Sequence, residues 1–491
     1  MENSILHFLE KGIKNLEEVK EIFWKNPEDI AALISGIRSV TDKLAQDILT
    51  EILENLDSLI REDAHRVENW YIVRKDQKQL VTTLGTITFH KTLFKNRQTG
   101  KCEYLADRLL GMEPHERMTE EAEARMLKEV AEVSYRKSGE LVSPTDGVSK
   151  QTVKNKIHRL EFQEPVAPLK KREVEYLYID ADEDHVKLQY QQKKGDLAVN
   201  EQNRKNNCEI VKLIYVYEGI EKEAPESRRH KLIHPYYFSG TYEGEDNKKL
   251  WDEVYRYIEM TYDLDKVKRI YLNADGGTWI QGGKRRIAGI VSVLDEFHLQ
   301  KYMIKATSHM LDSAEDARKE LKDTIQHKTK EEFNTVMDRI LLSADSGACR
   351  KRIEESRRYI LWNWTAAKIR LNNRTTVKGC SAEGHVSHVL SSRMSSRPMG
   401  WSRTGCDKMA HLRAYFYNGG DMLELVRYQE KKLPKAAGAE GDYEVISSAK
   451  MTAAERKTQN DTGKYYDVLQ ASIAGETVGK TAAIRSRIWG L

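Results

Sequence analysis

The chain has 491 residues, enough for about two to four domains and a sizeable hydrophobic core. Its 80 basic and 76 acidic residues nearly balance, so any affinity for nucleic acid depends on where the charges lie and not on their total. No apolar run approaches the length of a membrane span, no secretory signal is recognisable, and the five scattered cysteines form no zinc or disulfide pattern, so we expect a soluble, cytoplasmic protein.

Residues 1–65 repeat apolar positions at helical spacing and predict an N-terminal helical region. This stripe is either an element for self-association or a helical hairpin packed on its own domain. The stripe consists of Ile30, Leu33, Ile34, Ile37, Leu44, Ile48, Ile52, Leu56 and Ile60.

Residues 66–118 change to β-branched and aromatic runs separated by turn residues, which predicts a small β-rich region with an antiparallel meander.

Residues 119–163 return to the helical period and predict a helix-turn-helix DNA-binding unit. Helices are expected near 120–133 and 134–142, and a third is expected after Ser149, a favourable N-cap residue. Apolar residues of this third helix share one face, which leaves cationic and amide side chains for phosphates and base edges. An ordinary solvated basic face is the alternative. The DNA-binding candidates on this helix are Lys150, Gln151, Lys154 and Asn155.

Residues 174–299 follow the order strand, strand, strand, helix, strand, helix, strand, which is the chain order of an RNase H-like sheet. The third of these strands is expected at 231–238. Residues 300–376 are charged and helical, and predict an all-helical insertion. The last part of the core is expected at 377–425, followed by a C-terminal region at 426–491. The predicted fold class is therefore an α/β RNase H-like catalytic core with an all-helical insertion, plus N-terminal helical, small β-meander and helix-turn-helix regions.

Three acids occupy positions that such a core would bring together. Asp182 lies on the first core strand, and Asp275 follows a buried strand and precedes two glycines, at the kind of sheet edge where ligands gather. Glu383 precedes Val386 and Leu390 at helical spacing, so it is expected on the buried stripe of a helix. A buried carboxylate needs a positive partner, and a metal ion would provide it.

Two divalent ions held by three carboxylates stabilise the attacking and leaving oxygens of phosphodiester chemistry, and hard oxygen ligands favour Mg²⁺ or Mn²⁺. The three acids are therefore the candidate catalytic and metal-binding residues. Asp180 and Asp184 flank Asp182 at strand spacing and share its face, which leaves the identity of the first ligand open. Arg393 and Arg397 follow the third acid and are candidate contacts to DNA phosphates.

The chain resembles the ISLre-type bacterial insertion-sequence transposases, which are related to the Mutator superfamily of DDE transposases. The resemblance implies that Asp182, Asp275 and Glu383 form the DDE triad, with Asp295 and His298 in a supporting role. Its most specific blocks are Asp-Ala-Asp-Glu-Asp-His-Val (180–186), Asn-Ala-Asp-Gly-Gly-Thr-Trp-Ile (273–280), Leu-Asp-Glu-Phe-His-Leu (294–299) and the stretch from Glu-Gly-His-Val to Pro-Met-Gly-Trp (383–401).

The resemblance also implies a function, that of a DNA transposase. Such an enzyme binds the terminal inverted repeats of an element, hydrolyses phosphodiester bonds at its ends and transfers the 3′-OH to target DNA. The expected partners are double-stranded DNA, two Mg²⁺ or Mn²⁺ ions and, because two ends must be held together, further copies of the chain; no membrane partner is expected. The alternatives are a stand-alone metal-dependent nuclease on the same fold and a sequence-specific DNA-binding regulator with an inactive core.

Overall fold

The computed structural model describes residues 2–113, 115–190, 207–274, 277–373, 376–377 and 381–432. Its contacts divide into two compact units, one containing Met1–Met126 and Arg136–Lys150 and the other containing Leu127–Tyr135 and Gln151–Gln429. This division falls inside the predicted 119–163 unit, whose residues are shared between the two. Within the described ranges, no helix combines the length and apolar character that a bilayer span requires.

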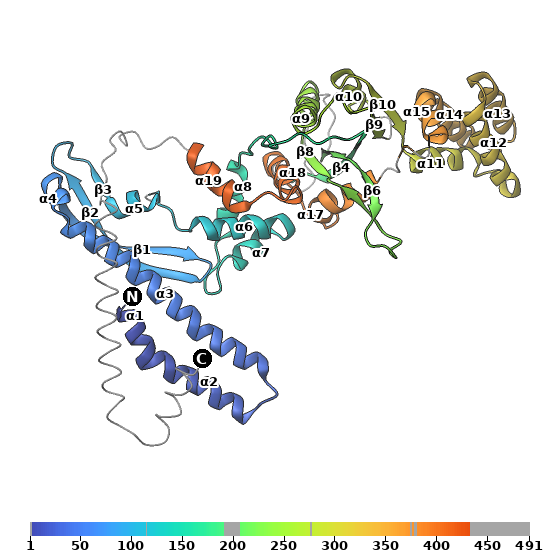
Figure 1. Cartoon of the computed structure of the whole chain (residues 1–491). Coiled ribbons are helices and arrows are strands. Elements are labelled where there is room, and N and C mark those ends of the chain that lie inside the picture. The colour runs from blue at the N-terminus through green and yellow to red at the C-terminus, as the bar shows by residue number, and fades with distance from the viewer. Residues whose placement is uncertain are drawn as a thin grey trace. The chain divides into compact units, whose positions relative to one another are not determined.

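The first unit contains a helical hairpin and a three-stranded antiparallel sheet with the order β1-β2-β3 (Figure 1). The sheet is the antiparallel meander that the sequence predicts for residues 66–118. The elements are α1 (Glu2–His7), η1 (Phe8–Gly12), α2 (Ile13–Lys25), α3 (Ile30–Glu62), α4 (Ala64–Asn69), β1 (Trp70–Thr82), β2 (Gly85–Asn96), β3 (Cys102–Tyr104) and α5 (Leu105–Leu110).

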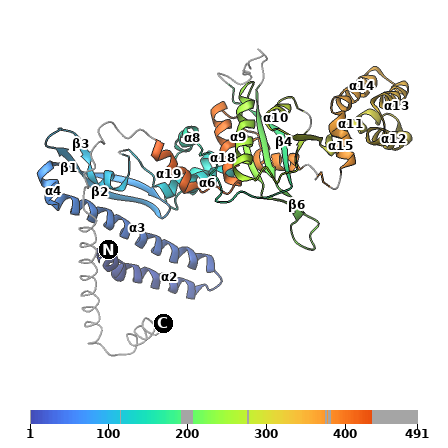
Figure 2. The same ribbon diagram turned by 45° about the horizontal axis from the view of Figure 1, so that its top comes forward.

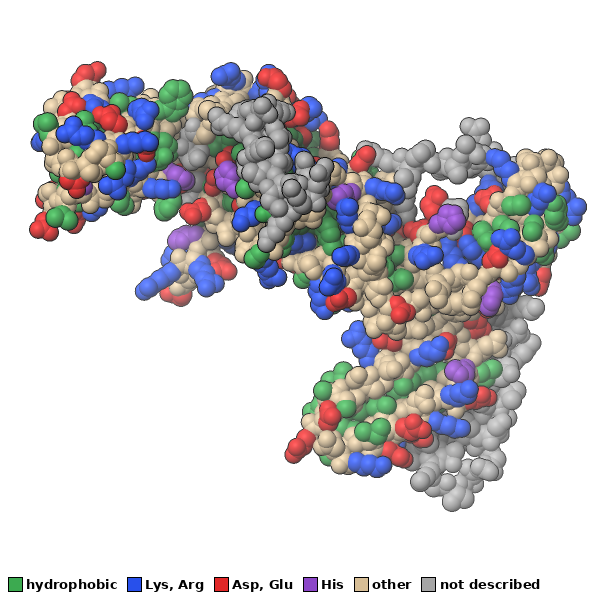
Figure 3. Space-filling view, turned by 180° about the vertical axis from the view of Figure 1, so that it is seen from behind, with side chains coloured by type: hydrophobic (Ala, Val, Ile, Leu, Met, Phe, Trp, Pro, Cys, Tyr) green, Lys and Arg blue, Asp and Glu red, His purple; other side chains and the backbone are tan. Residues whose placement is uncertain are grey.

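The predicted apolar stripe becomes the single long helix α3, and its two halves have different surroundings. In the second half, Leu53 and Ile60 are buried in clusters with residues of the sheet. In the first half, Ile34 is 61% exposed even though α2 packs on this part of the helix. Gly36 permits the close approach of α2, because a Cβ there would lie 2.7 Å from both methyl carbons of Val19. Apolar side chains are visible along the hairpin in Figure 3. The second half is therefore domain core, and self-association through the first half stays a prediction.

The helices predicted between 119 and 163 are present with nearly the expected ends, as α6 (Glu120–Glu132), α7 (Tyr135–Leu141) and α8 (Lys150–Arg159). The core that follows contains β4 (Tyr176–Lys187), β5 (Cys208–Tyr217), β6 (Gly219–Lys222), β7 (His230–Ile233), β8 (Tyr236–Gly240), α9 (Asp246–Thr261), β9 (Arg269–Ala274), α10 (Gln281–Arg286) and β10 (Ile290–Leu294).

Five of these strands form one mixed sheet with the order β10-β9-β4-β5-β8. The strands β4, β9 and β10 run parallel to one another, whereas β5 is antiparallel to β4 and β8 is antiparallel to β5. The prediction of one strand from 231 to 238 is wrong. The backbone turns at His234, which has a φ of 48°, so that β7 pairs with β6 outside the sheet while β8 joins it.

The two faces of β4 differ because side chains alternate along a strand. Leu177, Ile179 and Ala181 point into a hydrophobic cluster with Trp251 of α9. Here α10 comes close to α9, because a Cβ on Gly283 would lie 2.8 Å from the Trp251 ring. The helices α9 and α10 can be followed beside the sheet in Figure 1. The opposite face of β4 carries the aspartates considered below.

The helices between β10 and residue 373 lie together in Figure 2. They form their own hydrophobic cluster, which includes Leu294 at the end of β10. The described part of 300–376 is helical, as predicted for the insertion. The elements are α11 (Glu296–Thr307), η2 (Leu311–Ser313), α12 (Ala314–His327), α13 (Lys330–Leu342), α14 (Gly347–Trp362) and α15 (Trp364–Asn372). They are followed by α16 (Ala382–Val386), the π-helix η3 (Ser387–Ser391), α17 (Ser392–Met394), α18 (Arg403–Tyr417) and α19 (Met422–Lys432).

Candidate functional site

Asp180 is a buried structural acid. Its carboxyl group is 0% exposed, and burial raises its pKa while the hydrogen bonds from its neighbours act to lower it. One oxygen accepts from Asn273 Nδ2 at 2.7 Å and Tyr217 Oη at 3.1 Å. The other accepts from Tyr215 Oη at 2.7 Å and the backbone N–H of Ser381 at 3.2 Å. Four donors in a sealed site occupy this carboxyl group, so Asp180 does not fit the role of a metal ligand.

Asp184, at the other end of the acidic run, connects β4 to the helical segment 382–394. Its Oδ2 accepts from the hydroxyl groups of Ser391 at 3.0 Å and Ser395 at 2.7 Å. Asp182 lies between the two other acids and is half-buried, and its Oδ1 accepts from the backbone N–H of Glu183 at 2.8 Å. Of Asp180 and Asp182, which the sequence leaves open as candidates for the first ligand, Asp182 is thus the more accessible one.

The parallel strands β9 and β10 end side by side, whereas β4 continues past them to Lys187 as a partner of β5. Ala274, the last residue of β9, pairs with Ala181 on one side and with Leu294, the last residue of β10, on the other. Asp182 is the next residue of β4 after that pair, and neighbouring strands lie roughly 4.8 Å apart. Asp275 is the next residue after Ala274 in the sequence and lies outside the described residues.

Glu383 lies in the first turn of α16 and is exposed. The prediction that it belongs to the buried stripe is wrong. The stripe begins one residue earlier and keeps a spacing of four residues through the π-helix η3, whose turns are wider than those of an α-helix. The helix still begins against β4, because the backbone N–H of Ser381, two residues before Glu383, donates to Asp180. The buried positions are Ala382, Val386, Leu390 and Met394.

The supporting pair Asp295 and His298 is brought together by α11. Asp295 directly follows β10 and caps the helix, since its Oδ1 accepts from the backbone N–H of Phe297 at 3.2 Å. Its Oδ2 lies 3.0 Å from Nδ1 of His298. The pair therefore follows the end of β10, where Leu294 pairs with Ala274, the last residue of β9.

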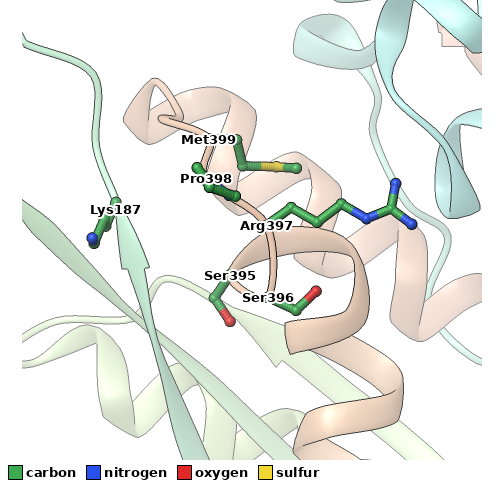
Figure 4. A pocket seen from close by; sticks show the side chains of 6 residues that line it. All are labelled: Lys187, Ser395, Ser396, Arg397, Pro398 and Met399. Carbon is green, nitrogen blue, oxygen red and sulfur yellow. The ribbon is translucent and has the colours of Figure 1, made fainter.

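The two arginines after Glu383 have different environments. Arg393 is 5% exposed, donates from Nε to the backbone oxygen of Val130 at 3.0 Å and stacks 4.9 Å from the ring centre of Trp401. The prediction that Arg393 contacts DNA is wrong, because interior partners hold its guanidinium group. Arg397 is exposed and stays a candidate. It lines a hollow of about 210 Å³ with Lys187, Ser395, Ser396, Pro398 and Met399, and its guanidinium extends away from Lys187 (Figure 4).

The helix α8 has the two faces that its sequence predicts. Val153, Ile157 and Leu160 are buried. On the opposite side, Gln151 Nε2 donates to Asn155 Oδ1 at 2.8 Å, so these two amide groups already form one exposed hydrogen-bonding unit. Lys150, Gln151 and Asn155 are exposed and Lys154 is half-buried.

Among the residues that the structure describes, no three His, Cys, Asp or Glu side chains are grouped closely enough to hold a metal ion. Asp275 is not among them, so the arrangement of three acids around two ions stays a prediction. His385 lies two residues after Glu383, and its half-buried imidazole is not an exposed group of the kind that binds a metal ion from solvent. Burial lowers its pKa to about 4, and its Nδ1 lies 2.9 Å from the hydroxyl of Tyr237.

Sequence reasoning misses the partners of Asp180, which are Tyr215, Tyr217, Asn273 and Ser381. One signal was available, since Asn273 is an amide at the end of an otherwise apolar buried strand. An unpaired buried amide costs about 1–3 kcal/mol, so its presence there indicates a polar partner.

Comparison with known proteins places the chain in a family. Residues 24–432 match the family described as "Uncharacterised protein family (UPF0236)". A UPF0236 protein of Caldanaerobacter subterraneus subsp. tengcongensis is 36% identical over 452 residues, which cover 92% of this chain and 90% of the relative. A second UPF0236 protein of that organism is 36% identical over 460 residues, which cover 93% and 92%.

The name of the first relative joins eleven locus designations, so this family is present in many copies in one genome. Among solved structures, one similar chain comes from "Drosophila P element transposase strand transfer complex". It is 10% identical, with a TM-score of 0.28 and coverage of 62% of this chain and 93% of that one. The family match and the two bacterial relatives, which extend over most of the chain, show that it belongs to the UPF0236 family.

Proposed function

We propose that this UPF0236 protein is a DNA transposase of the ISLre type, a metal-dependent enzyme that cuts the ends of a mobile element and joins the 3′-OH to target DNA. One observation carries the proposal. The strands β4 and β9 and the start of α16, which are far apart in the sequence, meet where β9 ends beside the middle of β4. The pairing of Ala181 with Ala274 joins the first two, and the hydrogen bond from Ser381 to Asp180 joins the third.

The sheet supports an RNase H-like interpretation of the core. Three antiparallel strands, β4, β5 and β8, come first in the chain, and the parallel strands β9 and β10 are then added beside β4. The all-helical insertion separates β10 from the helix that begins at Ala382. In this interpretation Asp182 lies within β4 beside the end of β9, Asp275 follows β9 in the sequence, and Glu383 is supplied by the helix after the insertion.

The donor set fits hard divalent ions. Asp182 is half-buried within β4 and Glu383 is exposed in the first turn of its helix, so both offer carboxylate oxygens of the type that Mg²⁺ and Mn²⁺ prefer. Two ions bound there would stabilise the attacking and leaving oxygens of phosphodiester cleavage. Asp184 has a different task in this proposal, which is to hold the helix that carries Glu383 on β4.

The copy number of the family supports the same function. Eleven locus designations under one protein name are typical of a protein that a mobile element carries to new positions in a genome. Neither a housekeeping nuclease nor a regulator accounts for such repetition as directly.

The proposal is tested by incubating the purified chain with DNA that carries the ends of its element, a target plasmid and Mg²⁺. We expect nicks at the element's 3′ ends and end-labelled DNA joined to the plasmid, and neither product in EDTA or with scrambled ends. Cleavage without joining would identify a nuclease, and end binding without cleavage would identify a DNA-binding regulator. Absence of cleavage and binding on authentic ends would refute the proposal.

The exposed face of α8 leads to a separate prediction about specificity. Replacing Lys150, Gln151 and Asn155 together by alanine should weaken binding to element ends more than binding to random DNA. Contacts to base edges contribute roughly 1–3 kcal/mol each, whereas a phosphate contact acts on all sequences alike. Competition gel shifts with both DNAs at one salt concentration measure the difference. An equal loss on both would mean that α8 does not read sequence.

A further inference from the structure

A buried chain of hydrogen bonds runs from the helical insertion into the sheet. Arg370, in the last turn of α15, donates from Nη2 to Asn273 Oδ1 at 2.8 Å and from Nε to the backbone oxygen of Leu294 at 3.0 Å. Asn273 donates from Nδ2 to Asp180 at 2.7 Å, and Asp180 accepts from the backbone N–H of Ser381 at 3.2 Å. Arg370, Asn273 and Asp180 are 2%, 0% and 0% exposed.

The residues joined by these hydrogen bonds lie at regular distances in the sequence from the proposed acids. Asn273, Asp180 and Ser381 each precede one acid by two positions, and Leu294 directly precedes Asp295. The acids that follow at that distance are Asp275, Asp182 and Glu383. The hydrogen bonds therefore hold the chain at a position two residues before each proposed acid.

Arg370 fixes the orientation of the Asn273 amide in this series of hydrogen bonds. An amide side chain has an acceptor and a donor end, and here the guanidinium binds the oxygen while the carboxyl group of Asp180 binds the nitrogen. The cation and the acid thus orient Asn273 between them. An apolar side chain at position 370 would fill the space, but would leave the buried amide and the Leu294 oxygen without this donor.

We infer that Arg370 is a positioning residue, which uses Asn273 and Asp180 to set the placement of β9, β4 and the helix that begins after Ser381. The helical insertion is in this way coupled to the site and is more than an appended domain. The consequence for catalysis rests on the proposed function, whereas the coupling among the three elements does not.

Hydrogen exchange of the full-length chain tests the coupling without requiring activity. In Arg370→Gln, peptides covering 176–187 and 381–394 should exchange hydrogen roughly tenfold faster. Local opening of these segments then breaks fewer hydrogen bonds and costs less free energy. The matched control is Arg357→Gln. Arg357 lies in α14, donates to Asn334 Oδ1 at 2.8 Å and pairs with Asp338 at 2.9 Å, so its partners all lie within the insertion. The control should change exchange in the insertion only, and unchanged 176–187 and 381–394 peptides in Arg370→Gln would overturn the inference.

The metal response of cleavage tests the positioning role. The Mn²⁺ concentration for half-maximal cleavage should rise roughly 10–100-fold in Arg370→Gln, as for other residues that orient metal ligands, while the Kd for DNA stays unchanged. Arg357→Gln should keep the response of the wild type. Should Arg370→Gln fail to fold, Arg370→Lys retains the charge but not the fork that reaches two acceptors, and should shift the response in the same direction by less.

Hydrogen exchange and the metal response of cleavage together separate the positioning role of Arg370 from the proposed function. A normal Mn²⁺ response in a folded Arg370→Gln protein with altered exchange would overturn the positioning role. A wild type without any metal-dependent cleavage would instead refute the proposed function, and the exchange experiment would still decide whether the insertion is coupled to the three elements.

Discussion

Replacing Asp182 by asparagine is expected to eliminate Mg²⁺-dependent cleavage while DNA binding survives. The amide keeps the shape of the side chain and still offers Oδ1 to the Glu183 N–H, but it loses the charge that would hold the ion. Loss of roughly 4 kcal/mol of transition-state stabilisation corresponds to about a thousandfold in rate. Gel shifts and cleavage assays on the same preparation measure both properties.

Asp184→Asn is the matched control for this experiment, because it removes a charge from the same face of the same strand. Its side chain oxygen can continue to accept from Ser391 and Ser395, so the helix stays on β4. We expect measurable cleavage that increases with raised Mn²⁺. If Asp182→Asn cleaves within about tenfold of the wild type, a difference of only about 1.4 kcal/mol in activation free energy, Asp182 does not belong to the site.

Local periodicity was sufficient to predict much of the secondary structure. A strand over the acidic run, the buried strand that ends before Asp275 and the apolar face of α8 all follow from alternation or helical spacing, which depend on neighbouring residues only. The same period-two argument put Asp180, Asp182 and Asp184 on one face. It could not rank them, because the donors that bury Asp180 come from β5, β9 and the residue before α16.

Two errors show where local reasoning stops. The sequence pattern predicts that the buried stripe of α16 begins at Glu383. In the structure it begins at Ala382 and keeps a four-residue spacing, because η3 changes the number of residues per turn. Arg393 has the sequence context of a basic surface residue, but its partner Val130 lies 263 positions away in the chain. Tertiary contacts decide whether a guanidinium meets solvent or a backbone oxygen, and the spacing of residues does not contain them.

The free energy of unfolding should separate Asp180 from Asp182 independently of any enzymatic assay. Asp180→Ala removes the acceptor of four donors in a sealed site, those of Tyr215, Tyr217, Asn273 and Ser381. We expect a loss of roughly 3–5 kcal/mol, because each buried group left unsatisfied is costly. Asp182→Ala should change stability by less than about 1 kcal/mol, since the side chain of Asp182 is only half-buried. Urea unfolding with equal m values measures both, and Asp180→Asn, which keeps one acceptor oxygen, should lie between them. If both alanine variants proved equally stable, Asp180 would not be sealed in its network, and both acids would again be candidates for the first ligand.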